Sequence, residues 1–202
     1  MLEISFGKDL PRPTITNEGK ATHLCEVQTG QARNALGWAR LENDLALCVE
    51  AAEEAMNLRQ DAGNVDRYIY SYFVSTYGRC FTDGKGRAGK LQVEHVPSRY
   101  TSVHQRIMHA RHNVIAHSGD AEENYGSMYI VMGVGEDHGK VLGVAPVLSS
   151  FRSVGPADWR TLHELASNLR QLAQSNIEEK TNNIQNWAYS LPDSERYSPA
   201  SS

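Results

Sequence analysis

The strongest constraint on the fold is the helical spacing of apolar residues in two long segments. In residues 31–59 the apolar side chains recur at steps of three and four, which places them on one face of an α-helix. A second long segment begins at Pro156, and proline favours the first turn of a helix. The first stripe is Leu41, Leu45, Cys48, Ala52 and Met56, and the second is Leu162, Leu165, Leu169, Leu172 and Ala173.

Two shorter segments are also predicted to be helical. Residues 64–80 follow a break at Gly63, and their aromatic side chains are better explained as core than as a platform for stacking bases. The side expected to face the core carries Val65, Ile69, Tyr72, Phe73 and Thr76. The next helix is predicted to begin near Ser98 or Thr101 and to reach about His117, where Ser118-Gly119-Asp120 provides a stop.

Between the last two helices, SMYIVMGV and KVLGVAPV are short β-rich runs separated by GEDHG, which predicts a hairpin at about 126–148. Residues 1–30 are expected to form an N-terminal arm with at most a short strand at Leu2 to Phe6. Residues 189–202 are expected to be a flexible C-terminal tail. The predicted fold is therefore mainly α: a four-helix bundle over 31–188, with a small β-hairpin between the third and fourth helices.

Composition places the chain among soluble globular proteins, with 202 residues, 40% hydrophobic and 22% charged. The net charge of −4 gives no global signature of a nucleic-acid binder. Three widely spaced cysteines predict neither a disulfide framework nor a zinc site. Without a leader peptide or a long apolar run, the protein is expected in the cytoplasm and away from membranes.

Positive charge is nevertheless concentrated between Arg79 and Arg111, where seven lysines and arginines stand against two acids, a local balance of +5. Within this stretch GKGRAGKL resembles a phosphate-binding loop in spacing, but Leu91 stands where Ser or Thr is needed, and the loop follows a helix instead of a strand. It is interpreted as a flexible basic connection. A solvated loop and a surface that faces a polyanion remain equal alternatives for it.

The stretch RHNVIAHSG, residues 111–119, carries the candidate chemistry. At 100° per residue, His117 continues the apolar stripe of its helix, and Arg106 and Asn113 lie within about 40° of it. Arg111 lies about 120° from His117 in an ideal straight helix. The two side chains therefore converge only if the helix end changes its winding, if Arg111 reaches around the groove, or if a second subunit supplies one of them.

An arginine followed, after a short spacer near the end of a bundle helix, by a histidine resembles the signature of the HEPN superfamily. The match here is Arg111, the five residues HNVIA, and His117. The flanking words IAHSGD and YGRCFTDGKGR look like bacterial members associated with abortive infection, antiphage defence and toxin–antitoxin loci. The resemblance covers about residues 35 to 185.

The resemblance implies a metal-independent endoribonuclease that needs no cofactor and acts on RNA as a homodimer, with an antitoxin or a defence complex as a further partner. Attack by the RNA 2′-hydroxyl on the adjacent phosphate requires a proton acceptor and a cation. His117 is the candidate acid/base, Arg111 the phosphate clamp, and Asn113 a positioning group. Because His112 directly follows the arginine, the positioning role is divided between His112 and Asn113.

Further candidates for binding RNA come from the basic loop and from the same helix. Loop cations would contact the RNA backbone, an interaction that weakens as salt is added. The candidate substrate-binding residues are Lys85, Arg87, Lys90, Arg106 and His112.

Other interpretations of these residues remain open at this stage. His117 can close its helix as a buried, hydrogen-bonded histidine, and Arg111 can pair with an acid of the first helix such as Glu50 or Glu53. His109 and His112 share a helical face on which zinc could bind, although no further ligand motif accompanies them. A non-catalytic dimeric HEPN module that binds RNA or a protein partner is the alternative to an enzyme.

Overall fold

The computed structural model describes residues 2–5, 14–18, 20–22, 27–58, 64–83, 89–115, 126–134, 138–148 and 156–191. The chain divides into two compact units, which are described separately. One unit is Leu36–Ile177, and the other combines Met1–Ala35 with Glu178–Ser202.

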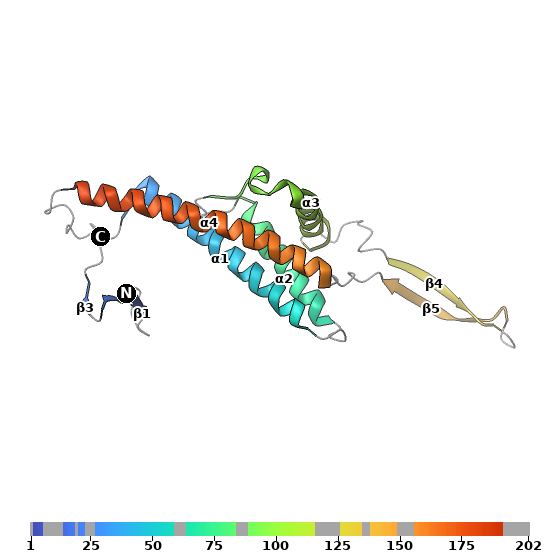
Figure 1. Ribbon diagram of the computed structural model, residues 1–202. Helices are drawn as coiled ribbons and strands as arrows, with labels where there is room; N and C mark the ends of the chain where they lie inside the picture. The colour runs from blue at the N-terminus through green and yellow to red at the C-terminus, as the bar shows by residue number, and fades with distance from the viewer. Residues whose placement is uncertain are drawn as a thin grey trace. The chain divides into compact units, whose positions relative to one another are not determined.

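Four α-helices build the larger unit, and the two long ones continue into the smaller unit (Figure 1). They are α1, Gly30–Asn57; α2, Asn64–Cys80; α3, Thr101–His109; and α4, Pro156–Ser190. A two-stranded hairpin lies between α3 and α4 in the sequence. The predicted class, a mainly helical fold with this hairpin, is confirmed.

Helix α2 contacts the other three helices of the larger unit. Toward α1, the Cys48 thiol donates to the carbonyl oxygen of Phe73 at 3.9 Å, and Arg79 pairs with Asp44 at 3.0 Å. Toward α4, the Trp159 indole N–H donates to Asp66 at 2.8 Å. In α1 Cys48 follows Asp44, whereas in α2 its partner Phe73 precedes Arg79, so α1 and α2 are antiparallel.

The core of the larger unit lies between these helices, and it corrects the predicted face of α2. Phe73 and Thr76 are buried as expected, but Val65 and Tyr72 are each 47% exposed. The buried face of α2 therefore differs from the predicted one. Because α2 contacts three neighbouring helices, its buried residues cover more than the single predicted stripe. The buried residues of α2 are Tyr70, Phe73, Val74, Thr76, Tyr77 and Cys80.

A buried polar contact joins α2 to α3. The Tyr77 hydroxyl lies 2.9 Å from His104 Nδ1, and the rings of Phe81 and His104 are 4.5 Å apart. Burial raises the pKa of Tyr77, which keeps its proton, and burial lowers the pKa of His104. Tyr77 is therefore the donor, and a neutral His104 accepts at Nδ1.

Two short 3₁₀ segments, η1 at Val93–His95 and η2 at Ser98–Tyr100, lead into α3. The Trp38 ring of α1 contacts the His95 ring edge-on, with 6.0 Å between centroids. The Tyr100 hydroxyl donates to Glu164 of α4 at 3.0 Å. These contacts fix the approach to α3 against both long helices.

The hairpin pairs β4, Gly126–Met132, with β5, Val141–Leu148, in antiparallel register. The pairing shifts at Val131 and Met132, and Gly133 N–H donates to the Lys140 carbonyl at 2.8 Å. Gly139 has a φ of +84°, a conformation that glycine adopts without steric cost, which suits a tight connection.

The smaller unit contains more β-structure than predicted. Three strands, β1 at Leu2–Ser5, β2 at Thr14–Asn17 and β3 at Lys20–Ala21, pair in that order as an antiparallel sheet. Only the first of them was expected, because β2 and β3 follow the prolines Pro11 and Pro13, which indicated irregular structure, and are too short to show a clear alternating pattern. Most of the predicted tail, residues 192–202, lies outside the described residues.

Lowering the pH is expected to destabilise the protein through His104. Its folded-state pKa lies below the ordinary value of 6.5, so the unfolded chain binds the proton more readily. The contribution to stability is complete above about pH 6.5 and is lost as the pH falls through the folded-state value. Urea unfolding of the wild type and of His104→Gln at pH 7.5 and 5.5 measures it. If the wild type and His104→Gln lost the same free energy of unfolding between pH 7.5 and 5.5, His104 would not be the source of the pH dependence.

Candidate functional site

Arg111 lies in a π-helix, Ala110–Ile115, that continues α3. A π-helix is wound more widely than an α-helix, and such segments frequently occur at functional sites. The angle of about 120° between Arg111 and His117 was calculated for an ideal α-helix and does not describe this segment. His117 itself lies outside the described residues.

The Arg111 side chain rests on the last turn of α2. A Cβ atom at Gly78 would overlap Arg111 Cδ and Nε, so the arginine occupies the space left by the missing side chain. Its Nη2 donates to Thr82 Oγ1 at 3.4 Å, and the same hydroxyl donates to the Gly78 carbonyl at 3.2 Å. Arg111 is therefore held along its length while remaining partly exposed.

The base of the predicted basic loop lies at the same turn. Lys90 Nζ pairs with Asp83 at 2.6 Å, and Leu91 N–H donates to the Cys80 carbonyl at 2.7 Å. Lys90 and Leu91 therefore lie at the end of α2, where Thr82 contacts Arg111 and Asp83 contacts Lys90. Two predicted site residues, Arg111 and Lys90, therefore contact the neighbouring residues Thr82 and Asp83.

The remaining predicted residues are distributed differently. Arg106 pairs with Asp158 of α4 at 3.4 Å, and His112 is exposed. The π-helix includes the backbone of Asn113, but its side chain is outside the described set. Lys85 and Arg87 also lie outside the described residues.

The contacts of Arg111 and Glu53 differ from the ion pair suggested between them. Glu53, a suggested partner of Arg111, instead accepts from His163 of α4 at 3.1 Å, while Arg111 contacts α2. Among the described residues, no group of three His, Cys, Asp or Glu side chains is placed to hold a metal ion.

The two described cysteines, Cys48 and Cys80, are buried. Burial, followed by the nearby Cys80, raises the pKa of the Cys48 thiol. A thiol that remains protonated in an apolar core is a poor nucleophile. Cys48 is therefore part of the packing between α1 and α2.

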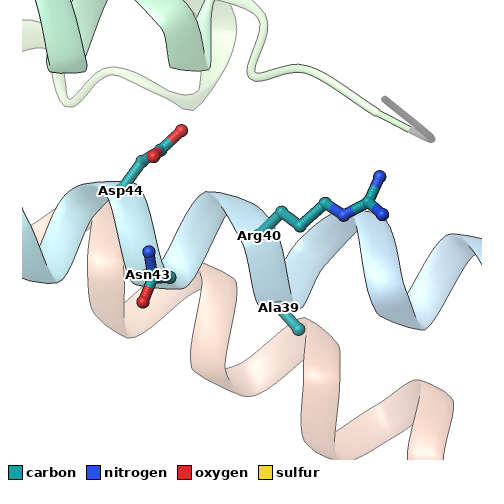
Figure 2. A pocket seen from close by; sticks show the side chains of 4 residues that line it. All are labelled: Ala39, Arg40, Asn43 and Asp44. Carbon is teal, nitrogen blue, oxygen red and sulfur yellow. The ribbon is translucent and has the colours of Figure 1, made fainter. Parts of the chain in front are cut away.

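A second polar feature is a surface hollow of about 290 Å³ on α1, lined by Ala39, Arg40, Asn43 and Asp44. Figure 2 shows Arg40 and Asp44 projecting from one side of the helix, about one turn apart. Asp44 is buried, and its pairing with Arg79 compensates the cost of removing a carboxylate from water. No pattern in the sequence indicated this hollow.

Gly78 and Thr82, the residues that position Arg111, were also not identified from the sequence. A signal was present, because a glycine inside a helical pattern costs about 1 kcal/mol relative to alanine and often has a packing reason. Nothing in the sequence indicated which side chain would use the space.

Comparisons of the chain with protein-family models, with curated proteins and with solved structures found no match. In the described part of the chain, none of the helices is long and apolar enough to cross a membrane.

Substituting Gly78→Ala is expected to displace Arg111, because the added Cβ overlaps its side chain. Overpacking costs about 1–3 kcal/mol, and the gain of about 1 kcal/mol for alanine over glycine in a helix offsets part of it, which leaves a net loss of up to about 2 kcal/mol. Gly89→Ala is the matched control, since a Cβ there meets nothing within 4 Å. Urea unfolding measures both variants. In the double variant Gly78→Ala/Arg111→Ala the clash is removed, and most of the lost stability should return. Equal losses in the single and double variants would contradict the proposed packing.

Proposed function

We propose that this protein is a metal-independent endoribonuclease of the HEPN type, in which Arg111 binds the phosphate that is attacked. The observation that carries the proposal is the anchoring of Arg111. Gly78 and Thr82 hold its side chain in one place at the end of the bundle, and the guanidinium remains partly exposed. A pre-positioned cation can stabilise developing negative charge without reorganising during the reaction.

The chemistry follows from these parts. The 2′-hydroxyl of RNA attacks the adjacent phosphorus, a base accepts its proton, and the 5′-oxygen of the next nucleotide leaves with a proton. The products are a 2′,3′-cyclic phosphate and a 5′-hydroxyl. The transition state carries its charge on phosphate oxygens, which the planar guanidinium of Arg111 can contact through two parallel N–H groups.

The proton-transfer role is assigned to His117 through its spacing from Arg111 in the HEPN signature. An imidazole has an ordinary pKa near 6.5, so it can both accept and donate a proton near neutral pH. Lys90, held beside Thr82 by its ion pair with Asp83, would contact the RNA backbone together with Lys85 and Arg87. His112 or Asn113 would orient the phosphate.

The biological setting is part of the same proposal. The protein would act as a homodimer in bacterial toxin–antitoxin or antiphage defence, where an antitoxin or a defence complex restrains it. Backbone contacts carry no sequence information, so cleavage would depend on salt more than on the sequence of the RNA.

Replacing Arg111 or His117 is expected to lower the rate of RNA cleavage strongly. Purified wild type should cut a mixed RNA pool in the presence of EDTA, and Arg111→Ala should lower the rate by about 10²–10³-fold, as the loss of a stabilising donor typically does. Arg111→Lys retains the charge but not the two parallel donors, so it should recover only part of the rate. Gel electrophoresis with end-group analysis measures the products.

Arg160→Ala is the matched control, because Arg160 is an exposed arginine on α4 that has no place in the site. Circular dichroism of each variant shows whether the fold is kept. Equal cleavage by the wild type and by folded Arg111→Ala would refute the assigned role. Binding of RNA without cleavage by the wild type would favour a non-catalytic RNA-binding module.

A further inference from the structure

Helices α1 and α2 present adjoining outward faces on which residues recur at alternating steps of three and four. Such spacing places side chains in one seam along a helix, the arrangement that helices use to pack against one another. The seam on α1 consists of Leu36, Arg40, Asn43, Leu47, Glu50 and Glu54. The seam on α2 consists of Val65, Tyr68, Tyr72, Ser75 and Arg79.

Large apolar and aromatic side chains are exposed in these seams. Tyr68 is 69% exposed, Tyr72 and Val65 are each 47% exposed, and Leu36 is 50% exposed. Tyrosine and arginine are enriched in the centres of protein interfaces, where a tyrosine buries much apolar area at little cost in side-chain entropy. This face has the composition of a helical interface.

The charges along α1 complement those of a second copy of α1 that runs in the opposite direction. Arg40 lies seven residues before Leu47, and Glu54 lies seven residues after it. When two copies of α1 run antiparallel and cross at Leu47, each Arg40 meets the Glu54 of the other copy. Asn43 and Glu50, four residues before and three after Leu47, then lie close enough for the amide to donate to the carboxylate.

The register of α2 agrees with this arrangement. Because the Cys48 thiol contacts the Phe73 carbonyl, Leu47 and the middle of the α2 seam lie at about the same level. When two copies of α2 run antiparallel and cross at that level, Tyr68 of one copy lies opposite Arg79 of the other. A guanidinium over a tyrosine ring is a favourable cation–π contact, and it leaves the bond from Arg79 to Asp44 in place.

We propose that the face formed by the α1 and α2 seams binds the same face of a second copy of this chain. A two-fold axis passes beside Leu47, and the helices pair antiparallel, α1 with α1 and α2 with α2. Each contact then occurs twice, as an isologous interface requires. This interface would belong to the homodimer in the proposed function, but its argument uses neither Arg111 nor RNA.

Exchanging the two charges tests the register directly. Arg40→Glu places two acids together at each end of the interface, and Glu54→Arg places two arginines together. Each should raise the dimer dissociation constant by at least about tenfold, as like charges do at an interface. The double variant Arg40→Glu/Glu54→Arg recreates the pairs with the signs exchanged, so it should recover most of the affinity. Sedimentation equilibrium of the full chain measures the masses.

Tyr68→Ser should weaken the dimer as well, while Tyr189→Ser is the matched control. Both tyrosines are strongly exposed, at 69% and 65%, but Tyr189 lies on α4 outside the face. Leu47→Cys should give a disulfide-linked dimer on mild air oxidation, because a residue beside the axis meets its own copy. The unsubstituted chain, tested in parallel, reports on its three native cysteines.

A wild type that is monomeric at tens of micromolar would overturn the proposal. A dimer whose dissociation constant is unchanged by Arg40→Glu, Glu54→Arg and Tyr68→Ser would overturn it as well. Failure of the double variant to restore a dimer would refute the antiparallel register. Because these measurements contain no RNA, their outcome is separate from that of the cleavage assay. A dimer without nuclease activity would leave this inference intact, and an active monomer would remove it while leaving the proposed chemistry.

Discussion

The burial of α2 against three other helices is the constraint on which the rest of the structure depends. Phe73 and Tyr77 are fully buried, and Trp159 of α4 packs edge-on against Phe73 with 6.0 Å between ring centroids. The Tyr77 hydroxyl and the His104 ring are paired beside this aromatic core, which limits the cost of removing these two groups from water. Because these contacts occur on three sides, α2 has little freedom to rotate about its own axis.

The orientation of α2 has consequences at its C-terminal end. Gly78 and Thr82, one turn apart, are presented to the segment that follows α3, and Arg111 lies across them. At the same end of α2, the Cys80 carbonyl accepts from the Leu91 N–H. Packing in the core therefore determines where a flexible cation is held at the surface, and this link connects the stability of the bundle to the proposed chemistry.

The same orientation leaves one side of α2 exposed. Tyr68 and Tyr72 cannot enter a core whose three contacts are already made, so they remain on the outer face beside the seam of α1. In the proposed dimer, this exposed side becomes the interface. The charged pattern of α1 is self-complementary in the antiparallel direction, whereas a parallel pairing places each Arg40 beside the Arg40 of the other copy.

Periodic apolar spacing and glycine or proline breaks are local properties of the sequence, and they were enough to predict the helices and the hairpin. It also indicated Arg111 and Lys90 as members of one basic region. The buried face of α2, with Tyr72 outside it, was decided by the tertiary structure, because burial depends on three neighbours that no local pattern specifies. Tertiary packing likewise decided that Arg111 would occupy the space above Gly78, and it left the segment around Arg111 wound as a π-helix. The contacts of Arg111 with Gly78 and Thr82 join residues that are far apart in the sequence and form only when the helices assemble, so the sequence could indicate the arginine but not its setting.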